Sequence, residues 1–572
     1  RRQRQMSIRD RTKNGGQSWE FASPDLSTGD KSKMGISGGL TPDNIGVEYC
    51  CVIYAFDESP VEKGVLWAGT NDGLVHVSRD NGNTWKDVTD NIPGLPPLGT
   101  VRNIDASKWD GGKAYITVDF HQVGNFDPYI YKTENYGRRW KKITRGIPSS
   151  TLSYTRNVRE DPVRPGLLYL GTENSLYVSF NDGDEWQPLM NNMPASPMYW
   201  IVIQEEFNDL VVGTYGRGIW IMDDITPLQQ LNKKITSSAS HLFEPRKVYR
   251  FRPITSPFTM FDDPSAGENP PYGASLNYWL KESSEDSVSI KISDQSGNLI
   301  RTLKGPSSTG INRVWWDLRG ELSKKIILRT KPLHVDWVEL DDEGTLDAAV
   351  GQSSALATPG TYIVELDAFG IKTSQKLSIV KDPHSEGSEK DIAEQTKLVL
   401  NIQSDINETA SLINRIEMIR SQLYDIRIMT KDHEVAEEIS TAVESLDKKF
   451  ISVEGELYQM RLTGAGQDGI RWPAKLAGKL GYLASVVETA DFPPNDQQRE
   501  VHQILKDRLT LYDKQFNNIL RNELPAFDRL MKKHKLTGIC LINTSDAADE
   551  RSSVDLGGRR IIKKKSVRGG GG

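Results

Sequence analysis

Several features that would narrow the function of this chain are scarce in its sequence. Among 572 residues there are only three cysteines, so the sequence supports no disulfide framework. It contains no run of about 18 apolar residues, the length that a membrane-spanning helix needs. The net charge is −6, whereas a surface that binds nucleic acid needs clustered basic residues. We therefore expect no membrane span and no nucleic-acid partner.

Two of the three cysteines, Cys50 and Cys51, are adjacent. Neighbouring cysteines do not readily bond to each other, so we interpret them as two small buried apolar side chains in a strand. A redox pair or a metal-binding pair is the alternative. On the simpler interpretation we predict no metal site and no cofactor.

The sequence does contain a phrase of eight residues that occurs four times, as in SRDNGNTW at residues 78–85. Each copy has a hydroxyl residue, then Asp or Asn, then Gly, and ends in Trp. The tryptophans are 66, 55 and 46 residues apart, which approaches the length of one β-propeller blade. The recurring residues are Thr12, Asn14, Gly16, Trp19, Ser78, Asp80, Gly82, Trp85, Thr133, Asn135, Gly137, Trp140, Ser179, Asn181, Gly183 and Trp186.

A second phrase accompanies the first, as WAGTNDGLVHVS from Trp67, YLGTENSLYVS from Tyr169 and VVGTYGRGIWIMDD from Val211. Each copy has a short apolar run, a Gly-Thr pair, and then residues that alternate between apolar and polar. The second phrase thus gives a strand, a Gly-Thr turn and another strand, and the turn of the first phrase with its Trp follows. This is the order of elements in a four-stranded antiparallel blade. The two phrases together predict a mainly β fold with part of a β-propeller.

These phrases resemble the Asp-box, or BNR, repeats of bacterial sortilin-like propeller proteins, which are often labelled glycosyl hydrolases. The strings GLVHVSRDNGNTW and REDPVRPGLLYLGTENSLYVSFNDGDEWQPL carry the resemblance, which extends over about residues 10–535. It implies an extracytoplasmic (secreted, periplasmic or cell-surface) protein whose propeller face binds a peptide, a protein or a glycan. It also implies that residues 1–231 supply about four to five blades of an incomplete ring. The chain starts without Met or an apolar signal core, so we expect further blades and an export signal to precede it.

The Asp-box itself is interpreted as a structural turn. Its acidic position is Asp80 in one copy but Asn14, Asn135 and Asn181 in the others. A general acid or a metal ligand needs a carboxylate, whereas a turn needs only a short side chain whose oxygen accepts backbone N–H bonds. Glycine then supplies a left-handed backbone position, and the Trp is expected to pack between sheets.

Any site is therefore expected near the Gly-Thr pairs, on one face of the propeller. Asp72 and Glu173 near these pairs, and Asp119 in the insertion VDFHQVGNFDPY, are catalytic candidates for a glycoside hydrolase with two carboxylates. A sialidase would need three arginines and a Tyr–Glu pair, which the sequence does not match. The hydrolase hypothesis remains the alternative to a binding protein, and a structural assembly factor is a third.

Three further side chains, one in the same insertion and two near a Gly-Thr pair, are candidate ligand contacts. His121 follows Asp119 closely and is interpreted mainly as a hydrogen-bonded loop residue. Tyr215 and Arg217 lie in GTYGRG, where the arginine between two glycines predicts either an anionic ligand or a pair with the acids at 223–224.

Residues 241–381 have another pattern, which resembles an Ig-like β-sandwich. SVSIKISDQSGNLIRTL alternates on both sides of Gly-Asn and predicts a hairpin. Trp315, Trp316 and Tyr362 are the expected core aromatics. We see no catalytic residues in this region.

Residues 391–537 predict an α-helical bundle, because apolar residues recur at helical spacing. Asp391, with Glu394 three residues later, predicts the capping box of the first helix, and Asn495 is expected to open the last. Residues 540–572 have no periodicity and include VDLGGRRIIKKK, which resembles translated sequencing-adapter sequence. We interpret them as a disordered, artefactual tail.

Overall fold

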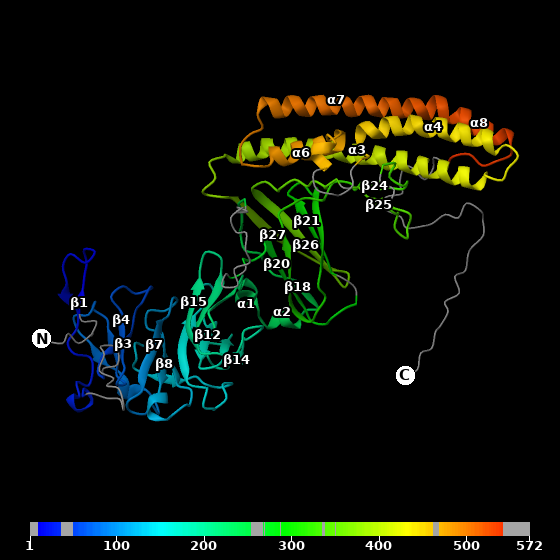
Figure 1. The fold of residues 1–572 in the computed structure, drawn as a ribbon. Coiled ribbons are helices and arrows are strands. Elements are labelled where there is room, and N and C mark those ends of the chain that lie inside the picture. The colour runs from blue at the N-terminus through cyan, green and yellow to red at the C-terminus, as the bar shows by residue number, and fades with distance from the viewer. Residues whose placement is uncertain are drawn as a thin grey trace, which may run out of the picture.

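The computed structural model divides into three successive regions (Figure 1). We call residues 53–222 the blade region, residues 240–381 the two-sheet region and residues 389–533 the helical region. The first nine residues and most of the predicted tail, residues 541–572, lie outside the described residues. The structure describes residues 10–35, 50–252, 267, 269–285, 288–334, 338–348, 350–461 and 468–540.

The blade region consists of four consecutive antiparallel sheets, each built from strands in sequence order. The first three sheets have four strands and the fourth has three. The first strands of neighbouring sheets contact one another, as blades do in a β-propeller. The strands are β3 (Ile53–Glu58), β4 (Leu66–Thr70), β5 (Val75–Ser78), β6 (Lys86–Asp87), β7 (Thr100–Ala106), β8 (Ala114–Asp119), β9 (Ile130–Thr133), β10 (Trp140–Lys142), β11 (Thr155–Glu160), β12 (Leu168–Thr172), β13 (Leu176–Ser179), β14 (Gln187–Pro188), β15 (Met198–Gln204), β16 (Asp209–Thr214) and β17 (Ile219–Met222).

The repeated turn has the same hydrogen bonds in all four copies. The hydroxyl oxygen accepts from the backbone N–H of the glycine, at 2.8 Å between Ser78 and Gly82. The Asp or Asn oxygen accepts from the residue before Trp, at 2.8 Å between Asp80 and Thr84. The corresponding distances in the three copies that have Asn are 2.9–3.0 Å. The turn therefore uses the oxygen that Asp and Asn share.

The tryptophans that follow these turns differ in burial. Trp140 and Trp186 are buried, and Trp85 packs at the edge of a small apolar cluster. Trp19, by contrast, is 61% exposed, so the expectation that it packs between sheets is wrong. Its turn joins the two short strands β1 (Asp10–Arg11) and β2 (Glu20–Phe21), and the described part of the chain places no second sheet against the indole.

The two-sheet region follows two short helices, α1 (Thr226–Gln230) and α2 (Lys233–Ser237). A three-stranded sheet of order β18-β20-β23 and a five-stranded sheet of order β19-β27-β26-β21-β22 share one apolar core. The predicted hairpin is confirmed by the antiparallel pairing of β21 and β22. The strands are β18 (Ser240–Leu242), β19 (Val248–Arg250), β20 (Ala274–Leu280), β21 (Val288–Asp294), β22 (Leu299–Gly305), β23 (Gly310–Trp316), β26 (Gly360–Ala368) and β27 (Ile371–Lys381), with the separate pair β24 (Ile327–Leu328) and β25 (Leu346–Asp347) beside the helices.

Of the three expected core aromatics, Trp316 and Tyr362 are buried and contact each other, whereas Trp315 is only partly buried. The expectation for Trp315 is wrong because successive side chains of a strand point to opposite faces. Only one of two adjacent tryptophans can enter the core, and the Arg313 guanidinium lies over the ring of the other at 5.8 Å.

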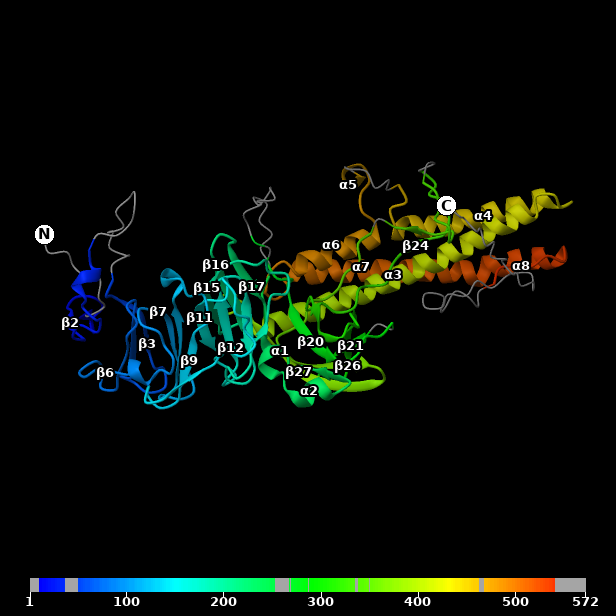
Figure 2. The same cartoon turned by 90° about the horizontal axis from the view of Figure 1, so that it is seen from below.

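The helical region lies along one end of the two-sheet region, and its long helices extend past it, away from the blades (Figure 2). Buried side chains of its long helices form one continuous apolar core. Among the described residues, no helix combines the length and the hydrophobicity needed to cross a bilayer. The helices are α3 (Glu389–Met429), α4 (Ala436–Leu457), α5 (Asp468–Arg471), α6 (Leu476–Val487), α7 (Asp496–Asn518) and α8 (Leu524–Lys533), with a π-helical turn (Ile519–Glu523) between the last two.

The two predicted helix starts had different outcomes. Asn495 caps α7 as expected, with Gln498 completing the capping box. The start of α3 is three residues earlier than predicted, because Ser388 is the N-cap and Asp391 is its partner in the box. The prediction placed Asp391 in the wrong role, since Ser and Asp are both good N-caps and only the backbone decides between them.

Buried charges join the regions. Asp224 accepts hydrogen bonds from Ser275 and Asn277, which ties the end of the last blade to β20. Asp491 pairs with Arg250 and Arg252, which ties the helices to β19.

Candidate binding site

The first strand of each blade carries the same irregularity. Its register with the second strand shifts by one residue in all four sheets, so that one residue is left without a partner. A bulge of this kind bends the strand and redirects one side chain. The residues at the four bulges are Tyr54, Arg102, Arg156 and Tyr199.

These four side chains, which we call the bulge cluster, meet although they come from four different sheets. Arg102 donates one hydrogen bond to the Tyr54 hydroxyl at 2.8 Å and another to the Tyr199 hydroxyl at 2.6 Å. The Arg156 guanidinium lies 5.2 Å from the centroid of the Tyr199 ring. The shared bulge therefore builds one surface from four repeats.

The Gly-Thr pairs lie opposite these bulges, and packing explains the glycine. A Cβ on Gly69 would lie 2.3 Å from the Val101 side chain, and one on Gly171 would lie 2.3 Å from the Met198 carbonyl oxygen. Val101 and Met198 each come just before the bulge of the next blade. Glycine at this position thus lets the neighbouring first strand approach closely.

Three of the candidate residues occupy equivalent places beside the bulge cluster. In each blade, the first-strand residue just before the bulge pairs with a residue near the end of the second strand. For example, Ile53 pairs with Thr70, and Thr155 pairs with Thr172. The residue that follows this second-strand partner lies at the same end of each of the four sheets. In the four blades this residue is Asn71, Asp119, Glu173 and Tyr215.

Asp119 and Glu173 lie on either side of one arginine. Glu173 Oε2 accepts from Arg156 Nε at 2.9 Å, and Asp119 Oδ2 lies 3.9 Å from the same guanidinium. His121 Nδ1 lies 2.8 Å from Asp119, and its ring stacks on Tyr154 at 4.9 Å between centroids. The two acids are therefore part of an ion-pair network and not a pair of free carboxyl groups.

This network fixes two protonation states. Burial alone would lower the pKa of Arg156, but Glu173 and Asp119 raise it above its ordinary value. Burial, together with the hydrogen-bonded Glu173 carboxylate, raises the pKa of Tyr154 to about 12. At neutral pH Arg156 is therefore a buried, paired cation and Tyr154 a neutral phenol beside it.

The remaining candidates lie apart from the bulge cluster. Asp72 is one residue further along than the equivalent positions above; it is buried and accepts from the backbone N–H and the hydroxyl of Thr28 at 2.8 and 2.7 Å. Arg217 is exposed, while the ring of its neighbour Tyr215 lies 6.1 Å from that of Tyr199. The structure thus gathers Asp119, Glu173, His121 and Tyr215, and it leaves Asp72 and Arg217 outside.

The bulge residues themselves were not among the predicted candidates. One signal in the sequence marks two of them: the dipeptide Arg-Asn recurs at 102–103 and 156–157, early in the first strand of consecutive blades. The asparagine has a role of its own, because Asn103 Oδ1 accepts from Val158 N in the next blade at 2.9 Å. The tyrosines at the other two bulges share no such signal.

No protein-family model and no curated protein sequence matches the chain. Similar solved structures include YCF48 from Cyanidioschyzon merolae, with 14% identity over 58% of this chain and 85% of that chain and a TM-score of 0.22. YCF48 bound to D1 peptide is 14% identical over 57% of this chain and 81% of that one, with a TM-score of 0.20. The GH74 xyloglucanase from Xanthomonas campestris is 12% identical over 57% and 54%, with a TM-score of 0.25. At these low scores, the description of the blade region as propeller-like rests on its strand order and pairing.

Proposed function

We propose that the blade region binds a peptide or protein segment that presents a carboxylate to the bulge cluster. The observation that carries this proposal is the convergence of four equivalent bulge residues on one surface. Arg102 donates there to two tyrosine hydroxyls and, among the described residues, to no carboxylate, so these bonds orient its guanidinium without an acidic partner. An oriented guanidinium is a good partner for a carboxylate, which it can bind through two parallel N–H bonds.

The aromatic side chains around Arg102 support a protein ligand. Tyr54, Tyr199 and Tyr215 are 43%, 42% and 74% exposed, although each carries a large apolar ring. Tyrosine and arginine are enriched at protein interfaces, where a rigid ring buries area and its hydroxyl keeps a hydrogen bond. The rings would pack against the ligand while Arg102 binds its charge.

Binding is favoured over glycoside hydrolysis because of the surroundings of the two acids. A glycosidase needs one carboxyl group that carries a proton for the leaving group. Asp119 and Glu173 are instead both engaged by the Arg156 guanidinium, at 3.9 and 2.5 Å. This pair is therefore suited to holding Arg156 in place.

We also propose that the chain is a sortilin-like Asp-box protein with an extracytoplasmic location, as the sequence suggested. Its domains would be a set of blades over 1–231, an Ig-like domain over 241–381 and a helical domain over 391–537. The common hydrogen bonds of the four turns support the Asp-box assignment. The resemblance implied a peptide, protein or glycan ligand. Among these three, we propose an acidic peptide segment.

An array of paired peptides tests the binding function. Each pair has the same sequence except that Asp and Glu are replaced by Asn and Gln in one member. The full chain is expected to retain acidic members, and R102Q to lose at least tenfold in affinity for them. R139Q is the matched control, because Arg139 is exposed at an Asp-box turn, which the antiparallel strands place at the opposite end of its sheet.

Two results would contradict the proposal. One is an identical peptide profile for R102Q and the unchanged chain. The other is release of sugar from a panel of polysaccharides and sialosides, which would favour the hydrolase.

A further inference from the structure

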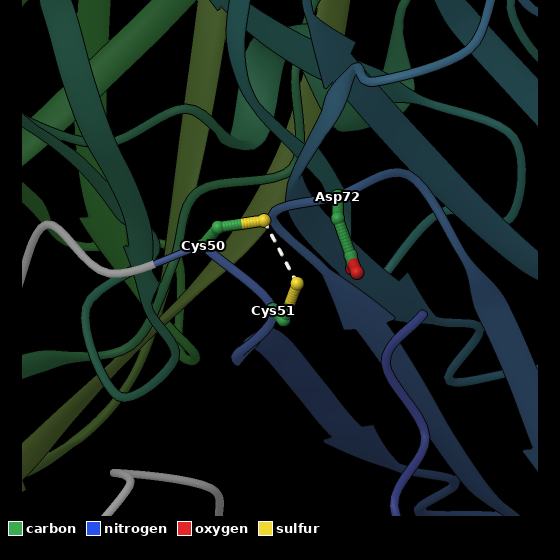
Figure 3. Close-up of side chains that lie close together, drawn as sticks. All are labelled: Cys50, Cys51 and Asp72. Carbon is green, nitrogen blue, oxygen red and sulfur yellow. Dashed lines mark hydrogen bonds between the residues drawn. The ribbon is translucent and has the colours of Figure 1, made fainter. Parts of the chain in front are cut away.

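A second cluster of reactive side chains lies outside the bulge cluster, at the start of the first blade (Figure 3). The sulfur atoms of Cys50 and Cys51 and a carboxylate oxygen of Asp72 all lie within 4.8 Å of one another. The cysteines come just before β3, and Asp72 lies in the turn between β4 and β5. Pairing of β3 with β4, from Ile53 and Thr70 onward, brings the two segments together.

The backbone of Cys51 explains how two adjacent side chains reach the same place. Its φ is 69°, in the left-handed region that non-glycine residues rarely adopt. In an extended chain, neighbouring side chains point to opposite faces. The left-handed turn instead brings the two Sγ atoms to 2.8 Å from each other.

The carboxylate of Asp72 has one oxygen engaged and one available. Oδ2 accepts both hydrogen bonds from Thr28, whereas Oδ1 is buried and has no hydrogen-bond partner among the described residues. A buried carboxylate oxygen without a partner is costly, and a cation is one of the groups that compensates it.

We propose that Cys50, Cys51 and Asp72 bind a thiophilic divalent ion, Zn²⁺ or Cd²⁺, through two thiolates and Asp72 Oδ1. Sulfur-rich sets with one oxygen suit these ions, and three protein ligands leave the fourth tetrahedral position open. Binding forms two metal–sulfur bonds and one metal–oxygen bond and releases the two thiol protons to water.

The geometry needs only a small adjustment for this. Two sulfurs bound to one tetrahedral zinc ion at about 2.3 Å lie about 3.8 Å apart, so the Sγ atoms must separate by about 1 Å. Cys51 is buried, while Cys50 is half-buried and gives an ion access from solvent. Because Asp72 also holds Thr28, the ion would strengthen the attachment of the segment around Thr28 to the first blade.

Titration of the reduced, metal-free full chain with Cd²⁺ alone tests the site, since cadmium–thiolate bonds absorb in the ultraviolet. The expected result is one Cd²⁺ per chain, competed by Zn²⁺. C50S and C51S are expected to lose the absorption, and D72N to bind at least tenfold more weakly while its remaining oxygen still accepts from Thr28. C540S is the matched control and is expected to bind like the unchanged chain.

Three results would overturn the proposal: no thiolate absorption in the unchanged chain, absorption that persists in both C50S and C51S, or absorption lost in C540S alone. Measuring the mass of the chain without reductant tests whether the cysteines form a disulfide. A loss of two hydrogens that persists in C540S, with no Cd²⁺ binding after reduction, would show a disulfide between the adjacent cysteines instead of a metal site and would also overturn the proposal. Far-UV circular dichroism checks that each variant is folded. C50S is the variant least expected to disturb folding, because Cys50 is only half-buried.

Discussion

The blade region and the helical region bury polar side chains in different ways. Between blades, amide and carboxylate oxygens accept from the backbone of the next sheet, as Asn157 does from Ile201 at 3.1 Å, and ion pairs such as that of Arg156 with Asp119 join neighbouring sheets two at a time. In the helical region one buried cation, Arg420, binds Glu417, Glu454 and Asp447 at 2.7–2.8 Å.

This difference shows how each region distributes its stability. The apolar core of the blade region is divided into separate clusters between sheets, and each polar bond serves one interface. The helical region has one continuous core, and its ionic cluster joins α3 to α4 within it. A substitution between blades should therefore have local effects, whereas one at Arg420 should affect the whole helical region.

The largest expected effect comes from Arg420→Met. This change leaves Glu417 and Glu454 buried without their cation, and breaking a buried ion pair costs about 3–5 kcal/mol. Chemical denaturation followed by the helical circular dichroism signal measures it. Arg427→Met is the control, because its pair with Glu444 is exposed and such pairs contribute at most about 1 kcal/mol. Equal effects in the two variants would contradict the comparison.

The next effect concerns pH and the blade region. Burial raises the pKa of Asp105 to about 7, against the opposing charge of Arg159. The folded chain then binds more protons than the unfolded chain between about pH 4 and pH 7, so stability falls as pH rises through this window. Urea denaturation should show a loss of about 2–3 kcal/mol from pH 5 to pH 8, which D105N removes. If the unfolding free energy of D105N falls with pH as steeply as that of the unchanged chain, other titrating groups cause the loss.

A smaller and more local effect is expected from the glycines of the Gly-Thr pairs. In Gly171→Ala the new Cβ would lie 2.3 Å from the Met198 carbonyl oxygen, and overpacking of this kind costs about 1–3 kcal/mol. Gly213→Ala is the matched control, because its nearest neighbour would be 3.7 Å away. Hydrogen exchange should increase in β11, β12 and β15 for the first variant only. Exchange that increases across the helical region as well would contradict the local model.

The smallest effect is expected at Asp80. Asp80→Asn keeps the oxygen that accepts from Thr84, as the three other turns do, so the unfolding midpoint should not change measurably. Asp80→Ala removes this acceptor and should lower the midpoint. Thermal denaturation of the two variants compares them directly; a lower midpoint in the Asn variant would give the charge a role.

Much of the local structure was predictable from the sequence. The hairpin of β21 and β22, the cap at Asn495 and the helical apolar stripes followed from residues that are close together in the chain. Errors arose where two neighbours were equally suited to one role, as with Trp315 and Trp316 or with Ser388 and Asp391.

The site was predictable only in part. The Gly-Thr pairs led to Glu173 and Tyr215, and the segment VDFHQVGNFDPY led to Asp119; the three residues lie at equivalent places in their sheets. The bulge residues were missed because a bulge is a feature of pairing between strands, and no local pattern marks Tyr54 or Tyr199.

The sequence by itself determined the repeat and the turns, because both depend on contacts within a few residues. Asn in three of the four turns was enough to separate turn geometry from charge. The tertiary structure decided which side chains meet. Arg102 and Tyr199 are 97 residues apart, and Asp72 and Thr28 are 44 apart. Such contacts follow from how strands pair and how sheets stack, which side-chain periodicity along the chain does not encode.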